Sequence, residues 1–256
     1  MNFRMKKNGF TLIELLTLLA ITGVLAAMLV PAMRQLQVIS DRTVDSNNIR
    51  MIVQASLNYA NDHGGKLPGG PLNLHGEIQA TGSSTDIPSI NSLAAALARG
   101  TDLNDPSFWI SRSDRHPDYR ADPKHILVQG QSPGSLIIEV DFNQSPVSLC
   151  YVANLNLSMP ASQPVAHTRG LHFNGQWLQQ NISVYGNEGG HIAFLGGQVK
   201  FYQNVGFSAM EGRLIGSDGQ RTNNILHTQP STSPVRFFSR PNSPTGSTFG
   251  MPGTGP

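Results

Sequence analysis

Residues 1–33 read MNFRMKKNGFTLIELLTLLAITGVLAAMLVPAM, and this stretch decides how the rest of the chain is organised. From Phe10 to Met33 the only ionisable side chain is Glu14. A helix rises ~1.5 Å per residue, so the run spans ~36 Å, more than the ~30 Å hydrocarbon core of a bilayer. We therefore expect residues 10–33 to form a transmembrane helix in contact with membrane lipid.

Glu14 is the unusual residue of this segment. An ionised carboxylate deep in a membrane helix costs at least ~2.5 to 3.5 kcal/mol and persists mainly where it has a partner. No cation lies within the apolar run. Cleavage between Gly9 and Phe10 would create an α-amine one helical turn before Glu14. In an assembly of staggered helices, Glu14 of one subunit could then meet the Phe10 amine of the next.

The residues around Glu14 form a recognisable signal. Lys6 and Lys7 precede Gly9, and Phe10 is followed four residues later by the lone Glu14. This arrangement resembles the class III signal of type IV prepilins and type II secretion pseudopilins, and it covers about an eighth of the chain. The resemblance implies that a prepilin peptidase cuts after Gly9, that Phe10 becomes the N-methylated N-terminus, and that Glu14 is the assembly carboxylate.

The same resemblance implies a set of partners and a helix bend. The partners are the prepilin peptidase, other pilin or pseudopilin subunits and an inner-membrane assembly platform. Pro31 falls where many members of the family have a helix-bending proline. It removes one backbone donor and crowds the carbonyl of Ala27, so a bend or local melting is expected there.

Two other kinds of membrane segment are alternatives to this interpretation. A cleaved secretory signal peptide also begins with basic residues, and Val24-Leu25-Ala26 is a passable signal peptidase site. Its apolar region is only ~7 to 15 residues, however, which is shorter than the run here. An ordinary uncleaved anchor explains the length but gives no reason for Glu14.

The charge distribution predicts the location of the chain. The full sequence has 18 basic and 16 acidic residues, and the leader holds three of the basic ones, so the mature chain is nearly neutral. No basic field remains to recruit nucleic acid, and we expect no nucleic-acid partner. Basic residues before the span predict a single-pass protein of the inner (cytoplasmic) membrane, with its N-terminus in the cytoplasm and its C-terminal domain periplasmic or extracytoplasmic.

Beyond Pro31 the helical pattern resumes, with an apolar stripe formed by Ile49, Ile52, Val53, Leu57 and Ala60. The cluster of Asn61 to Gly65 ends the helix, and Pro68 prevents its return. The stripe needs a sheet to cover it. The predicted fold is therefore α+β and pilin-like: a long N-terminal transmembrane helix packed on a C-terminal antiparallel β-sheet with long loops.

The remaining elements are short. A capped helix is expected over 93–99, and strands over 126–129, 136–142 and 149–154. Asn174-Gly175 has the chemistry of a two-residue hairpin turn between 171–173 and 176–178. The strongest hairpin runs from His191 to Tyr202. With a turn at Gly196-Gly197, Phe194 should face Val199 and Ile192 should face Phe201, and we expect that face to cover the helix stripe.

The sequence gives no foothold for catalysis. It has no nucleotide-binding glycine loop, HExxH, CxxC or GxSxG motif. One polar loop gathers Asp114, His116, Asp118, Asp122 and His125, and oxygen-rich loops in some pseudopilins bind calcium. The interleaved Arg112, Arg115, Arg120 and Lys124 could neutralise these acids without an ion, so we expect no metal and no cofactor. Cys150 is the only cysteine and is expected to be a small buried strand residue.

These features predict a non-enzymatic, membrane-anchored pilin-like subunit of a type II secretion pseudopilus or a type IV pilus. The alternative is a single-pass anchored extracytoplasmic binding domain that does not polymerise. An exported enzyme has no positive sequence support. The expected organisation is a basic leader (1–9), the transmembrane part of the helix (10–33), a projecting amphipathic helix (34–62), a globular sheet-containing domain (63–205) and a Pro/Gly/Ser-rich disordered tail (206–256).

Overall fold

The computed structural model describes residues 11–68, 90–115, 123–131, 134–152, 155–179, 182–208 and 210–228. Its helices are α1 (Leu12–Asp62), α2 (Ile90–Gly100) and α3 (Val140–Gln144), with 3-10 turns η1 (Pro106–Phe108), η2 (Gly186–Glu188) and η3 (Ile225–Thr228). Its strands are β1 (Leu127–Gln129), β2 (Leu136–Ile138), β3 (Leu149–Tyr151), β4 (Pro164–Thr168), β5 (Gly190–Phe194), β6 (Val199–Tyr202), β7 (Leu214–Ile215) and β8 (Arg221–Thr222). The antiparallel sheets and the long apolar helix give the expected α+β, pilin-like architecture.

The chain divides into two compact units between Thr43 and Val44, and α1 runs through the boundary. In the first unit the described side chains from Thr11 to Val30 are all exposed. In the second unit the apolar stripe of α1 is buried as predicted, because Ile49, Ile52 and Val53 are at most 1% exposed. Hydrophobic burial therefore holds only the C-terminal part of α1 within a protein core.

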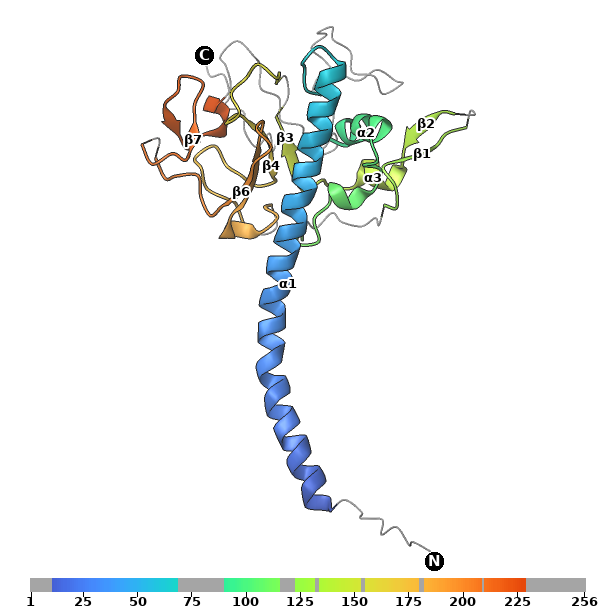
Figure 1. Cartoon of the computed structure of the whole chain (residues 1–256), viewed down its shortest axis with the longest axis vertical. Coiled ribbons are helices and arrows are strands. Elements are labelled where there is room, and N and C mark those ends of the chain that lie inside the picture. The colour runs from blue at the N-terminus through green and yellow to red at the C-terminus, as the bar shows by residue number, and fades with distance from the viewer. Residues whose placement is uncertain are drawn as a thin grey trace, which may run out of the picture. The chain divides into compact units, whose positions relative to one another are not determined.

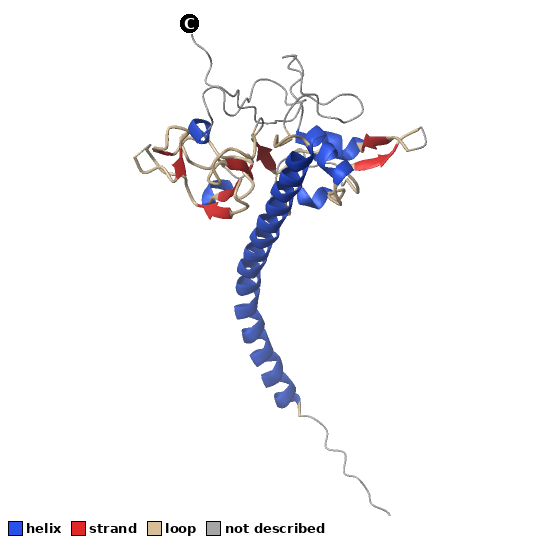
Figure 2. Ribbon diagram, turned by 45° about the horizontal axis from the view of Figure 1, so that its top comes forward, coloured by secondary structure: helices blue, strands red, loops and turns tan. Residues whose placement is uncertain are grey.

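α1 ends where the glycine cluster predicts. Gly65 N donates to Ala60 O at 2.7 Å and His63 N donates to the same oxygen at 3.2 Å. Gly64 and Gly65 have φ values of 63° and 81°, which only glycine adopts without strain. The C-terminal part of α1 lies between the four-stranded sheet and α2 in both views (Figures 1 and 2).

The main sheet has the antiparallel strand order β3-β4-β5-β6. The inner strand β4 is buried at all five positions. It was not predicted, because it begins at Pro164 and a strand buried on both faces lacks the alternation of apolar and polar residues. One hydrophobic cluster, which we call the helix-side core, includes Ile52 of α1, Ala193 and Leu195. A second, which we call the outer core, includes Trp177, Ile192, Phe194, Val205, Leu214 and Ile225.

The predicted register of the β5–β6 hairpin is wrong by one residue. Ala193 pairs with Val199 and Ile192 pairs with Lys200. Phe194 N donates to Gln198 O at 2.9 Å, which leaves a three-residue turn over 195–197 with φ of 79° at Gly197. A shift of one residue moves each side chain to the opposite face. The face that meets α1 therefore carries Ala193, while Ile192 and Phe194 lie in the outer core.

The predicted two-residue turn at Asn174-Gly175 is also one residue longer in the structure. Leu171 pairs with Trp177, and His172 N donates to Gln176 O at 2.9 Å, so the turn has three residues rather than two. Gly175 has a φ of 82° at the last turn position, as Gly197 does in the other hairpin. Three-residue hairpins place a left-handed glycine there, so the glycines were located correctly and the turn length was not.

The predicted strand over 136–142 is also too long. β2 ends at Ile138 and α3 begins at Val140. The Glu139 carboxylate accepts hydrogen bonds from Lys124 N at 3.0 Å and His125 N at 2.9 Å, which ties the chain down at this point. α3 then turns Phe142 into the core, where it is fully buried.

The predicted disordered tail is wrong for its first part. Residues 210–228 contain β7, β8 and η3, and Leu214 and Ile225 are 1% and 4% exposed. These two side chains complete the outer core against the far face of β5. Gly and polar residues between them conceal this contribution in the sequence. Residues 229–256 lie outside the described part of the chain.

A buried hydrogen-bond network links the C-terminal part of α1 to other residues of the second unit. Asp45 of α1 accepts hydrogen bonds at Oδ2 from Ser111 Oγ and from the Tyr185 hydroxyl. The Tyr185 hydroxyl also lies 3.3 Å from His191 Nδ1 on β5. Asp45 is only 7% exposed, so these bonds offset the cost of taking its carboxylate out of water.

Candidate processing and assembly site

The candidate site is the first part of α1. Leu12 and Ile13 are 83% and 67% exposed, and within the described residues α1 is the one helix long and apolar enough to cross a membrane. The most apolar stretch of α1 is not buried by any other part of the described chain. Such a surface is stable in lipid or against other apolar helices.

Glu14 forms a cap at the start of α1 with Thr11. Its Oε2 accepts hydrogen bonds from Thr11 N and Thr11 Oγ1, both at 2.8 Å, and Glu14 N lies 3.4 Å from Thr11 Oγ1. This is the reciprocal capping box of a Thr-x-x-Glu sequence. Thr11 was not among the predicted site residues, although its spacing from Glu14 is the signal of this cap.

The cap makes a charged Glu14 easier to accommodate. The carboxylate sits in the first turn, where the helix dipole favours negative charge, and it satisfies two donors. Both strong bonds go to Oε2, and Oε1 has no hydrogen bond within the described residues. One carboxylate oxygen therefore remains open to a second donor.

The other sequence-predicted site residues are only partly described. Lys6, Lys7, Gly9 and Phe10 lie outside the described residues. The backbone of α1 is helical through Pro31 without interruption. A bend at this position stays a prediction.

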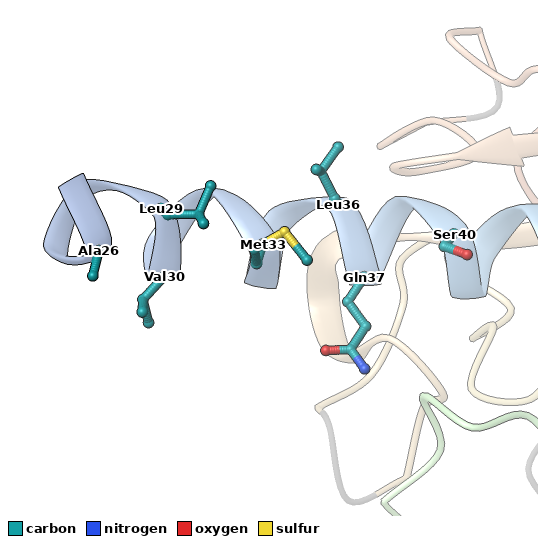
Figure 3. Close-up of a pocket in the computed structure, with 7 residues that line it drawn as sticks. All are labelled: Ala26, Leu29, Val30, Met33, Leu36, Gln37 and Ser40. Atoms are coloured by element: carbon teal, nitrogen blue, oxygen red, sulfur yellow. The ribbon is translucent and has the colours of Figure 1, made fainter. Parts of the chain in front are cut away.

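A shallow groove follows one side of α1 from Ala26 to Ser40. Ala26, Met33 and Ser40 stand at seven-residue intervals along it (Figure 3). Leu29 and Leu36 occupy the positions between them. Val30 and Gln37 flank this line. Spacing of seven with alternate steps of three and four is the seam along which two helices pack. We call these residues the heptad seam.

Of the acidic loop, the structure describes Asp114 and His125. Asp114 Oδ1 is 2.7 Å from Arg169 Nη2, and Asp114 Oδ2 accepts from Ser148 Oγ at 2.7 Å. Arg169, next to β4, thus forms an ion pair with Asp114 that the sequence did not indicate. Within the described residues no group of three metal-ligand side chains occurs. His125 is exposed, and the other acidic-loop candidates, His116, Asp118 and Asp122, lie outside the described residues.

Cys150 lies on β3 opposite His167 of β4. Desolvation raises the pKa of its thiol to about 11, against a smaller opposing effect of the Arg169 charge. The thiol is therefore protonated at neutral pH and a poor nucleophile. Cys150 thus lies on a strand as predicted, but it is half-buried rather than fully buried.

Comparison with known proteins identifies the N-terminal stretch. Residues 4–30 match the family described as the prokaryotic N-terminal methylation motif. The chain carries a pilin-like class III signal. No curated protein matches the chain, and no solved structure matches it. The motif and the apolar helix together indicate a membrane-anchored, single-pass substrate of a prepilin-type peptidase.

Proposed function

We propose that the protein is a structural subunit of a type II secretion pseudopilus or a type IV pilus, anchored in the inner membrane with its C-terminal unit outside the cytoplasm. The observation that carries the proposal is the state of Glu14. Its carboxylate stands in an exposed apolar helix inside the methylation motif, and one of its oxygens is open. Assembly on the inner-membrane platform would bring a cation to that oxygen.

The cation we assign is the α-amine of a neighbouring subunit. Cleavage after Gly9 leaves this amine on Phe10, and N-methylation retains its positive charge. The Thr11 cap holds Oε2, so the incoming amine would bind Oε1 without breaking the bonds within the subunit. In a low-dielectric bundle such a pair is stabilised only while both partners are present.

The heptad seam supports lateral packing of the same helices. Ala26 and Ser40 are small, which allows backbones to approach, and Leu29, Met33 and Leu36 supply apolar contact. Leu36 is 60% exposed although it follows the predicted end of the span. The apolar surface that needs a partner therefore extends beyond the bilayer. A structural role explains this surface, and no described group of residues calls for a catalytic one.

The first test is the intact mass of the protein purified from membranes. We expect a chain that begins at N-methylated Phe10. The same gene expressed without a prepilin peptidase provides the control and should keep Met1. A chain that keeps Met1 in the presence of the peptidase would support the anchored, non-polymerising domain instead. A chain that starts near Met28 would indicate an ordinary signal peptide.

The second test measures assembly in Glu14 variants. Glu14→Ala should leave cleavage intact but lower the ratio of subunit in sheared filaments to subunit in membrane, because the neighbouring amine loses its counter-ion. Glu14→Gln should fall between, since an amide can accept a hydrogen bond from the amine without carrying charge. Thr17→Val is the control, because Thr17 Oγ1 donates only to the Glu14 backbone oxygen at 3.0 Å. Equal ratios in all variants would contradict the proposal.

A further inference from the structure

Within the described residues, the β1–β2 hairpin leaves one edge of β2 without a strand partner. It forms a separate two-stranded sheet, and Figures 1 and 2 both show it extending away from the other strands. Gly130 N donates to Ser135 O at 2.8 Å and Glu139 N to Ile126 O at 2.9 Å. Because bonded and non-bonded pairs alternate, the backbone groups of the intervening Leu136 and Ile138 point away from β1.

This free edge is apolar, unlike the edges that β6 and β8 form. Leu136 is 43% exposed and Ile137 is 51% exposed, and Val140 just after the strand is 64% exposed. Exposed edges usually carry a charge that discourages pairing, as Lys200 does on β6 and Arg221 does on β8. β2 contains only Leu and Ile. A short, unprotected apolar edge is the kind of surface that accepts another strand.

We propose that the free edge of β2 pairs antiparallel with β2 of a second copy of this chain, about a two-fold axis at Ile137. In this arrangement Leu136 of each copy exchanges backbone hydrogen bonds with Ile138 of the other. The two Ile137 residues face each other in a non-hydrogen-bonded pair. One isologous contact thus satisfies the outward backbone groups of both strands.

The charges beside β2 favour a second copy over an unrelated strand. Arg99 Nη2 donates to Leu136 O at 2.8 Å, which places a guanidinium at one end of the edge. Glu139 follows the other end, and its bonds to backbone amides use only Oε2. The two-fold axis brings Arg99 of each copy beside Glu139 of the other. A strand from another protein would need the same charge order to fit as well.

The existing Arg99 contact is compatible with this pairing. A carbonyl oxygen has two lone pairs, so Leu136 O can accept from Arg99 and from Ile138 of the second copy at the same time. The Glu139 Oε1 atom has no hydrogen bond within the described residues. The pairing therefore adds backbone bonds and two ion pairs without displacing a bond that the subunit already makes.

Cysteine cross-linking of the full chain in membranes tests the proposal. Facing residues of a non-hydrogen-bonded pair have Cβ atoms ~4.5 to 5.5 Å apart, close to the range for a disulfide. Under mild oxidation Ile137→Cys should run mostly as a disulfide-linked dimer of this chain. Ile215→Cys is the matched control, because Ile215 is also an isoleucine on a two-stranded hairpin and is 44% exposed. It should stay at the wild-type level, which Cys150 sets.

Two further variants make the outcome decisive. Ile137→Lys places two like charges opposite each other. It should abolish the dimer that is captured from wild type by a cross-linker that does not react with amines. Ile215→Lys should retain this dimer. The Ile137→Cys dimer should persist in a Glu14→Ala background, because the contact does not involve the membrane helix. The proposal is overturned by equal cross-linking at Ile137 and Ile215, by cross-linking of Ile137→Cys to a protein of another mass, or by loss of the dimer with Glu14→Ala.

Discussion

At the scale of single residues, the Thr11–Glu14 cap links the local physics of a helix end to assembly. The cap holds the Glu14 carboxylate over the first turn through two bonds at 2.8 Å. A long side chain that is already ordered loses less conformational entropy when a partner binds. The cap should therefore present Oε1 in a fixed position, in addition to stabilising the first turn.

Thr11→Val tests this role of Thr11. Removal of the hydroxyl should destabilise the first turn by about 1 kcal/mol, the usual cost of losing a helix cap, and should lower the filament-to-membrane ratio less than Glu14→Ala does. Hydrogen exchange of the backbone amides of residues 12–15 in micelles measures the first effect. Thr22→Val is the control, because Thr22 Oγ1 donates only to helix backbone oxygens. Unchanged exchange in Thr11→Val would contradict the cap.

His167 predicts a dependence of stability on pH. Its side chain is 3% exposed on β4, and burial lowers its pKa from 6.5 to about 4. Between these values the unfolded chain binds a proton that the folded chain does not. The stabilisation is therefore complete above pH 6.5 and is lost as the pH falls towards 4. The loss should reach about 3 kcal/mol, from 1.4 kcal/mol per pKa unit.

Thermal unfolding between pH 4 and 7 measures this effect. The free energy of unfolding of wild type should fall more steeply with acidification than that of His167→Gln, because glutamine does not titrate. His125→Gln removes an exposed histidine and should follow the wild-type curve. Parallel curves for wild type and His167→Gln would show that His167 does not titrate differently in the folded chain.

At the scale of elements, a left-handed glycine closes each of three hairpin turns. Gly197, Gly175 and Gly219 have φ values of 79°, 82° and 79°, each at the last position of a three-residue turn. Only glycine adopts this conformation freely. The turn length in the β5–β6 hairpin fits the register in which Ala193 pairs with Val199.

Gly197→Ala should destabilise the protein by about 1 kcal/mol, because a residue with a Cβ is strained in the left-handed region. A Cβ at this position would meet nothing within 4 Å, so the cost is conformational rather than steric. Gly197→Asn should cost less, since asparagine tolerates that region. Denaturant unfolding ranks the two variants. Equal losses would show that the turn does not need the left-handed conformation.

At the scale of the whole molecule, the two units are stabilised in different ways. The first unit is an exposed apolar helix that requires lipid or other subunits, whereas the second has its own cores. The outer core depends on residues near the end of the described chain, since Leu214 and Ile225 cover Ile192. The folded part therefore extends at least to Thr228 rather than ending at Val205.

Truncation tests this boundary. A chain that ends at Thr228 keeps Leu214 and Ile225 and should melt at a higher temperature than a chain that ends at Val205. A chain that ends at Val205 loses two buried aliphatic side chains, each worth about 1.5 to 3 kcal/mol of burial, and should melt earlier and be cut faster by protease. Both chains keep the methylation motif, so both should still be inserted in the membrane. Equal melting temperatures would restore Val205 as the boundary.

The sequence by itself determined the features that depend on near neighbours. These are the N-terminal signal, the apolar stripe of α1, the glycines that end it at Asp62 and the positions of the turn glycines. Each is encoded within one helical turn or one tight turn, where spacing alone specifies the geometry. The Thr11 cap belongs to the same class, because its Thr-x-x-Glu spacing is visible in the sequence.

The tertiary structure decided the features that depend on distant partners. Arg169 lies 55 residues from the Asp114 carboxylate that it neutralises, and β4 is recognisable only as the strand between β3 and β5. The order of residues 210–228 arises because Leu214 and Ile225 cover the outer face of β5. The one-residue register shift of β5 and β6 has the same origin. Turn chemistry allowed two or three residues, and burial of Ala193 on one face and Ile192 on the other selected three.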